Sequence, residues 1–243
     1  MKHNSFYFLH IPKTDGRRFI DSIVIPLQNN SSQLNFIGGE LGFHVREKSN
    51  PHQGWIESID ENTYIVSILR DPIERAVSYY VFIMMQKIKA IEGFSKYKKV
   101  VFSKDQFIKY IQEQEDMHNL SSKMFLHHIP SQKDGSILFD NISIKLPESA
   151  DLVMERAQRI NLLIRSDTFK GLDRQDLFDR ITSDMGIPSI PCSSISPEIE
   201  SWYTEKESKD LYLSLSDSDK VMLMEYFDLD YEIYSNETLF SII

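Results

Sequence analysis

Apolar runs and segments of helical spacing alternate along the 243-residue chain. Three short, nearly continuous apolar runs predict strands buried on both faces, and a fourth short segment predicts a further strand: residues 6–11, 64–69, 161–165 and 35–38. Apolar residues three and four apart predict helices at residues 16–27, 72–91, 103–113, 116–127, 148–159, 174–185 and 216–227. Strands that alternate with helices predict a parallel sheet covered on both sides. We therefore expect one α/β domain, residues 1–243, with a central, mainly parallel sheet flanked by helices.

Composition narrows the classes of function. The chain is 41% hydrophobic, enough for a folded core, and its formal net charge of −9 gives a surface that repels nucleic acid. The single cysteine, Cys192, excludes an intrachain disulfide and favours a reducing compartment, and we interpret it as an inert thiol. No run reaches the roughly 18 apolar residues of a membrane span, and no secretory signal is visible. We therefore expect a cytoplasmic protein without a nucleic-acid partner.

A positive charge, a hydroxyl and a glycine follow the first predicted strand, in LHIPKTDGRRF (residues 9–19). The start of a helix attracts phosphate because its first N–H groups are unpaired and its dipole is positive there. Lys13 can reach an anionic oxygen, Thr14 offers a hydroxyl, and Gly16 allows the backbone to approach a ligand. The spacing of an ordinary nucleoside-triphosphate loop, G-x-x-x-x-G-K-[ST], is absent, which disfavours a common kinase or GTPase.

A second turn of this kind follows the third predicted strand, in SILRDPIERAVSYY (residues 67–80). Arg70 leaves the strand, and Asp71 is expected to cap the helix that begins at the next proline. Ser78 lies two helical turns further along the same side, so a guanidinium and a hydroxyl could hold one phosphate. For Arg75 we favour a helix-surface pair with Asp71. Two such turns at one sheet edge imply a ligand with two phosphate-like groups.

The two segments together resemble the sulfotransferases that use 3′-phosphoadenosine 5′-phosphosulfate (PAPS). HIPKTDGRRF is similar to the family's HIPKTGGTSF-type segment, and LRDPIERAVSYY is similar to its LRDPVERxxSxY segment. The match is closest to the carbohydrate-type branch, which includes the heparan sulfate 2-O-sulfotransferase-like enzymes. Weaker similarities, in the family's order, lie at residues 38–45, 118–126 and 227–234.

The resemblance implies a role for each matching residue. Lys13, Thr14 and Gly16 would bind the 5′-phosphosulfate, and Arg70 and Ser78 would bind the 3′-phosphate. Lys13 would also stabilise the charge that develops on the oxygen between phosphate and sulfate. The resemblance further implies a P-loop-like three-layer fold and in-line transfer to a hydroxyl of a carbohydrate or small metabolite.

Three positions of the first turn depart from the family's pattern. Asp15 stands where the family has glycine or alanine, and Arg17 and Arg18 replace a Thr–Ser pair. Asp15 brings negative charge near the expected anion unless it points away or pairs with Arg17 or Arg18, whereas the two arginines could substitute for the lost hydroxyls. All three stay among the expected donor-binding residues. They also motivate an alternative, a non-catalytic nucleotide-binding protein on the same fold. An atypical nucleotide kinase is disfavoured because nothing resembles its acidic metal ligand.

Transfer to an alcohol requires a group that takes the alcohol's proton, and histidine suits this at neutral pH. His44 is the best candidate, because it follows a glycine-rich segment (residues 38–42) at the end of the second predicted strand and matches the family's Gly-His segment. Glu40 and Glu47 are alternative bases, and His10 is expected to be a buried, hydrogen-bonded residue of the first strand. No metal site is expected, since the possible ligands form no cluster of usable spacing.

Overall fold

The sheet of this protein is small and entirely parallel. The computed structural model describes residues 2–30, 34–37, 54–56, 59–92, 100–126, 150–189 and 205–240. Four strands pair in the order β2-β1-β3-β4, with the bounds β1 Ser5–Leu9, β2 Asn35–Ile37, β3 Thr63–Leu69 and β4 Leu162–Arg165. All three strand pairs are parallel. The predicted α/β class and mainly parallel sheet are therefore confirmed, and each predicted strand forms within a residue or two of its expected bounds.

Helices connect these strands and extend the chain beyond the last one. Before β4 they are α1 Gly16–Phe19, the π-helix η1 Ile20–Val24, α2 Ile25–Asn30, α4 Pro72–Glu92, α5 Lys104–Glu113, the 3-10 helix η2 Glu115–Met117, α6 Leu120–Leu126 and α7 Ala150–Gln158. After β4 they are α8 Ser166–Gly171, α9 Arg174–Met185, α10 Glu205–Ser214, α11 Asp217–Met224, α12 Asp228–Ser235 and the 3-10 helix η4 Glu237–Leu239.

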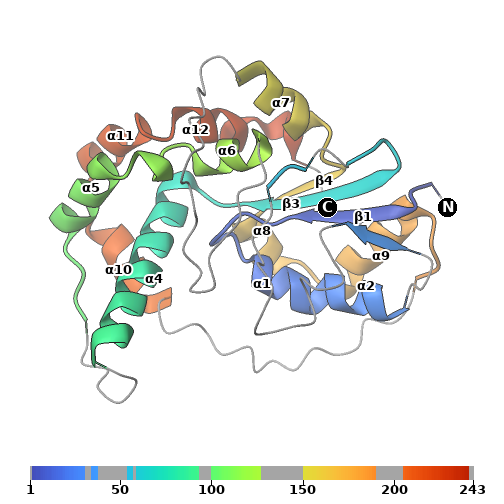
Figure 1. Ribbon diagram of the computed structural model, residues 1–243, viewed down its shortest axis with the longest axis horizontal. Helices are drawn as coiled ribbons and strands as arrows, with labels where there is room; N and C mark the ends of the chain where they lie inside the picture. The colour runs from blue at the N-terminus through green and yellow to red at the C-terminus, as the bar shows by residue number, and fades with distance from the viewer. Residues whose placement is uncertain are drawn as a thin grey trace.

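Alternate residues of each central strand face opposite layers of the core. Phe6 and Phe8 of β1 join one apolar cluster with Phe19 of α1, Leu27 of α2 and Phe178 of α9. Figure 1 shows these helices together on one side of the sheet. Because side chains of a strand alternate in direction, the continuous apolar runs supply both clusters at once.

The other face of the sheet carries the larger helical layer. Tyr7 and Leu9 of β1 join a cluster that includes Ala76 of α4, Phe125 of α6 and Ile233 of α12. In Figure 1, α4, α5, α6, α10, α11 and α12 form this layer beside the sheet. The three-layer arrangement is therefore present, with the sheet between two groups of helices.

Two predicted helices are interrupted. The first contains the π-helix η1, in which the Ile25 N–H bonds to the Ile20 carbonyl, directly before Pro26. Proline has no N–H and cannot donate the next backbone hydrogen bond of a helix. The wider i→i+5 bonding of the π-helix is found at the residue directly before this proline. The helix expected at residues 116–127 divides into η2 and α6 at Asn119, whose φ of 48° is incompatible with a continuous α-helix.

Several predictions lie outside the described residues. These include the glycine-rich segment with His44, Glu40 and Glu47, and also Cys192. The helices α8, α10 and α12 were not predicted, and the short, polar sequences of α8 and α10 carry no strong apolar period. Within the described parts of the chain, no helix is both long enough and apolar enough to cross a membrane.

Candidate functional site

The two turns singled out in the sequence lie side by side at the carboxyl edge of the sheet, the edge that is formed by the carboxyl ends of its parallel strands. β1 and β3 are neighbouring parallel strands, and Leu9 is opposite Ser67 near their carboxyl ends. The Ser67 hydroxyl donates a hydrogen bond of 2.9 Å to the Leu9 carbonyl, which joins the two strand ends directly. Both turns therefore begin side by side, at the edge where ligands of parallel α/β sheets bind.

The first turn is tightly wound. Lys13 and Asp15 have φ values of 66° and 62°, in the left-handed region that side chains other than glycine rarely adopt. Thr14 between them is fully buried, and its hydroxyl donates to the Ile11 carbonyl at 2.8 Å. The Thr14 hydroxyl hydrogen is thus used within the turn, whereas the sequence suggested that it would face a phosphosulfate.

Gly16 is required by His10, the residue directly after β1. A Cβ atom at this position would lie 1.9 Å from Nε2 of His10. The His10 ring is buried, as predicted, and it stacks on Phe8 with 5.1 Å between ring centroids. A buried, stacked ring has little room to move, so the absence of a side chain at Gly16 allows α1 to start directly over His10.

Asp15 is held by the opposite charges around it. Its carboxylate lies 3.5 Å from Nη1 of Arg18 and 3.6 Å from Nζ of Lys170, and it accepts a hydrogen bond from the Ser166 hydroxyl. The predicted alternative of an Asp15–Arg18 pair is therefore what the structure contains. Arg18 also lies 3.7 Å from a carboxylate oxygen of Glu205. The side chain of Arg17 lies outside the described residues.

Ser166 and Lys170 were not predicted as site residues. They belong to α8, which follows β4 directly, so a third strand end contributes to the same edge. In the sequence they are an isolated serine and lysine about 150 residues from Asp15, and a contact at that separation leaves no local signal. Only the position of β4 beside β3 brings them to the first turn.

The second turn has the predicted cap. Asp71 Oδ1 accepts a hydrogen bond of 2.9 Å from the Glu74 amide, which satisfies one of the unpaired N–H groups at the start of α4. Arg70 Nε donates to the Glu74 carboxylate at 3.0 Å. Because this bond uses Nε alone, it leaves both terminal nitrogens of Arg70 for other acceptors. Ser78 lies on α4 and is buried.

The prediction for Arg75 was wrong. Its side chain is fully buried, and Nη2 lies 3.3 Å from Asp230 of α12, in place of a surface pair with Asp71. The helical spacing of four residues between Asp71 and Arg75 is correct, but the N-cap role of Asp71 directs its carboxylate toward the Glu74 amide. Burial lowers the pKa of Arg75, and the charge of Asp230 opposes that shift.

Lys13 connects the two turns. Its Nζ lies 3.7 Å from the centre of the Phe82 ring, one helical turn beyond Ser78 on α4. Burial, and then the positive charge of Arg70, lower the pKa of Lys13 to about 7. Among the described residues no carboxylate lies within ion-pair distance of Lys13. Lys13 therefore lies near Arg70 at this edge, and the described residues include no acidic partner for Lys13.

Comparison with known proteins leaves the family of the chain open: no family model and no curated protein matches it. Within the described ranges, no three His, Cys, Asp or Glu side chains are grouped so that they could hold a metal ion. The site is therefore interpreted from its own residues.

The contact between Gly16 and His10 makes a prediction about stability. Gly16→Ala is expected to lower the free energy of unfolding by about 1–3 kcal/mol, the usual cost of forcing an extra methyl into a packed site. Urea denaturation would measure it. Gly171→Ala is the matched control and should have little effect, because nothing lies within 4 Å of a Cβ at that position. In a His10→Ala background the cost of Gly16→Ala should largely disappear, and an undiminished cost would show that the ring is not its cause.

Proposed function

We propose that this protein is a PAPS-dependent sulfotransferase with a P-loop-like fold, acting on a hydroxyl of a carbohydrate or small metabolite. The proposal combines the resemblance of residues 9–19 and 67–80 with the position of both segments at one sheet edge. The observation that carries it is the hydrogen bond from Ser67 to Leu9, which joins the ends of β1 and β3 and so places the two turns, with Lys13 and Arg70, side by side.

Two cations held near one another form a site that favours an anion. Their mutual repulsion raises the free energy of the unliganded protein, and a ligand that brings one anionic group to each of them would offset that repulsion. In the proposed complex, Lys13 contacts the 5′-phosphosulfate, while the terminal nitrogens of Arg70 and the Ser78 hydroxyl hold the 3′-phosphate. A guanidinium presents paired donors in the geometry that phosphate oxygens accept.

The proposed reaction transfers one sulfuryl group. The hydroxyl oxygen of the acceptor forms a bond to sulfur while the bond between sulfur and the bridging oxygen breaks. The products are a sulfate ester and adenosine 3′,5′-bisphosphate, and a base takes the hydroxyl proton. Lys13, when protonated, would stabilise the negative charge on the bridging oxygen as it leaves. His44 is the proposed base on sequence grounds, since it lies outside the described residues.

A second candidate is a non-catalytic nucleotide-binding protein, and a specific observation favours it. Two expected ligand donors are already used within the protein: the Thr14 hydroxyl bonds to Ile11, and Arg18 pairs with Asp15. Such a turn has fewer groups left to stabilise charge that develops only in a transition state. Tight binding of adenosine 3′,5′-bisphosphate together with no transfer would favour this candidate.

Binding of adenosine 3′,5′-bisphosphate tests the site itself, with isothermal titration calorimetry as the measurement. Arg70→Ala should weaken binding by about 1.5–3 kcal/mol, the usual contribution of a hydrogen bond to a charged group. Adenosine 5′-phosphate, which lacks the 3′-phosphate, should bind the wild type and Arg70→Ala almost equally. Arg180→Ala is the control, since Arg180 pairs with Asp184 within α9. Equal loss for both nucleotides would contradict the assigned role of Arg70.

The lowered pKa of Lys13 predicts a pH dependence of binding. Without ligand, Lys13 loses its proton as the pH rises through about 7, whereas a bound anion favours the protonated form. Binding therefore takes up a proton above this pH, and the dissociation constant should rise by up to about tenfold per pH unit. Calorimetry between about pH 7.5 and 9.5 would measure it, because the phosphates are fully ionised there. Lys13→Arg should give a nearly flat profile, and a flat wild-type profile would contradict the shifted pKa.

Transfer of labelled sulfate from PAPS to a panel of alcohols tests the enzymatic part of the proposal. His44→Ala should retain binding of adenosine 3′,5′-bisphosphate but lose transfer by about 10²–10⁴-fold, the usual contribution of a general base. Unchanged transfer in this variant would exclude His44 as the base. No transfer and no nucleotide binding by the wild type would overturn the proposed function as a whole.

A further inference from the structure

The start of α4 is held by the C-terminal helix α12 at two places. The Tyr231 hydroxyl donates to Asp71 Oδ2 at 2.9 Å, and Asp230 Oδ2 lies 3.3 Å from Arg75 Nη2. Asp71 is the residue before α4, and Arg75 lies one turn into the helix. Both contacts therefore fall between Arg70 and Ser78, the two residues proposed to hold one phosphate.

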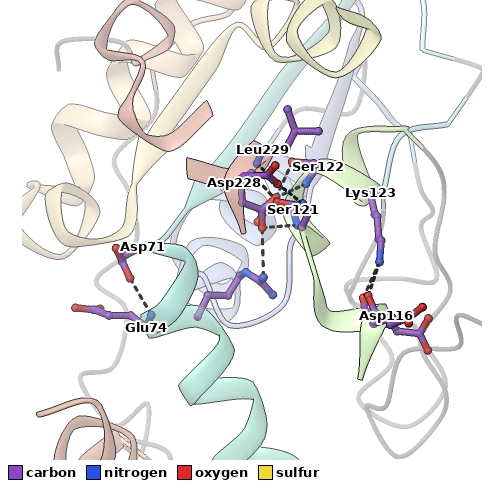
Figure 2. A network of polar contacts seen from close by, with 12 residues as sticks. Asp71, Glu74, Asp116, Ser121, Ser122, Lys123, Asp228 and Leu229 are labelled. Atoms are coloured by element: carbon purple, nitrogen blue, oxygen red, sulfur yellow. Dashed lines mark hydrogen bonds and ion pairs between the residues drawn. The ribbon is translucent and has the colours of Figure 1, made fainter. Parts of the chain in front are cut away.

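Asp230 is in turn fixed by α6. Its carboxylate accepts hydrogen bonds from the Ser121 amide at 3.1 Å, the Ser122 amide at 2.7 Å and the Ser122 hydroxyl at 2.6 Å. Figure 2 shows Ser121 and Ser122 gathered with Asp228 at the start of α12, and Asp71 and Glu74 at the start of α4. Asn119 completes the contact, because its side chain accepts from the Asp230 amide and donates to Asp228. The position of Asp230 is therefore set by several bonds, independently of Arg75.

Stability alone is a poor explanation for the Arg75–Asp230 pair. Both residues are buried, and among the described residues Nε and Nη1 of Arg75 have no hydrogen-bond partner. A buried ion pair with unsatisfied donors often adds no more stability than apolar side chains of similar volume. What the pair does supply is a directional contact that fixes the rotation and position of α4 relative to α12 and α6.

We propose that Tyr231 and Asp230 are positioning residues, which place Arg70 and Ser78 for the 3′-phosphate by holding the first turns of α4. The identity of the ligand in this proposal rests on the proposed function, whereas the hold on α4 does not. The C-terminal helix would then contribute to phosphate recognition without touching the phosphate.

The test compares Tyr231→Phe with a matched control, Tyr64→Phe. Each change removes one hydroxyl that donates to an aspartate, since the Tyr64 hydroxyl donates to Asp184 at 2.8 Å. Tyr64 lies near the amino end of β3, away from the turns. Hydrogen exchange followed by mass spectrometry should show about fivefold faster exchange in residues 72–80 for Tyr231→Phe, the effect of one lost hydrogen bond. Exchange in α9 should stay unchanged, and Tyr64→Phe should leave residues 72–80 unchanged.

Nucleotide binding supplies the functional measurement. In Tyr231→Phe the ratio of affinities for adenosine 3′,5′-bisphosphate and adenosine 5′-phosphate should fall about threefold to tenfold, because only the first ligand reaches Arg70 and Ser78. A purely structural role would lower both affinities together. An unchanged ratio with measurable binding, or unchanged exchange in residues 72–80, would overturn the proposal. If the wild type binds neither nucleotide, the proposed function fails, and the exchange data alone decide whether α12 holds α4.

A double variant, Arg75→Met with Asp230→Asn, gives a second test. The asparagine oxygen can still accept from the Ser122 amide and hydroxyl, which bond to Oδ1 of Asp230, whereas the Ser121 amide, which bonds to Oδ2, loses its acceptor and the charge pair is removed. We expect a urea midpoint lowered by no more than the loss of one hydrogen bond, with faster exchange confined to the first turns of α4 and of α6. A much lower midpoint with exchange raised equally in all helices would show that the network serves global stability, and it would overturn the positioning role.

Discussion

The parallel pairing of β1 with β3 is the constraint on which the rest of the site depends. It places the ends of the two strands next to one another, joined by the hydrogen bond from Ser67 to Leu9. Lys13 and Arg70 follow these ends, and burial, together with the positive charge of Arg70, disfavours the charge of Lys13. The fold tolerates this repulsion because Lys13 lies against the Phe82 ring and because its pKa falls. A bound anion would offset the repulsion between the two cations and raise the pKa of Lys13 again.

Acidic side chains near the carboxyl ends of the strands determine which positive charges stay available to an anionic ligand. Asp15 is bound to Arg18 and Lys170, while Glu74 bonds to Nε of Arg70. The negative charge of Asp15 is thus largely offset by Arg18 and Lys170, so it repels a bound anion only weakly. In a chain of net charge −9, positive potential at this edge is therefore a local property, set by Lys13 and the terminal nitrogens of Arg70.

The two turns are supported by different layers of the protein. Gly16 starts the first helix directly over the His10 ring, at the end of a strand whose aromatic side chains pack against α1. The second turn is held by hydrogen bonds and an ion pair to α12, which are fixed in turn by α6. Packing fixes the first turn by excluding volume, whereas directional polar contacts fix the second. A change in the C-terminal helix can therefore affect one half of the site separately from the other.

The features that the sequence predicted correctly are those encoded over a few neighbouring residues. The strands follow from continuous apolar runs and the cap at Asp71 from its place before a proline. The helix predicted at residues 174–185 ends at Met185, where Gly186 adopts a left-handed φ of 69° that glycine tolerates readily. The Asp15–Arg18 pair was also among the alternatives, since three residues separate them on a helix start.

Contacts across the fold were beyond reach from one sequence. Arg75 looked like a surface residue because its burial depends on Asp230, 155 positions away in the chain. Ser166 and Lys170 join the first turn only because β4 lies beside β3. The sequence alone therefore determined the elements and the chemistry at each turn, since propensity, capping and apolar period act locally. Tertiary structure decided which side chains are neutralised, buried or left for a ligand, because charge and burial depend on neighbours that only folding brings together.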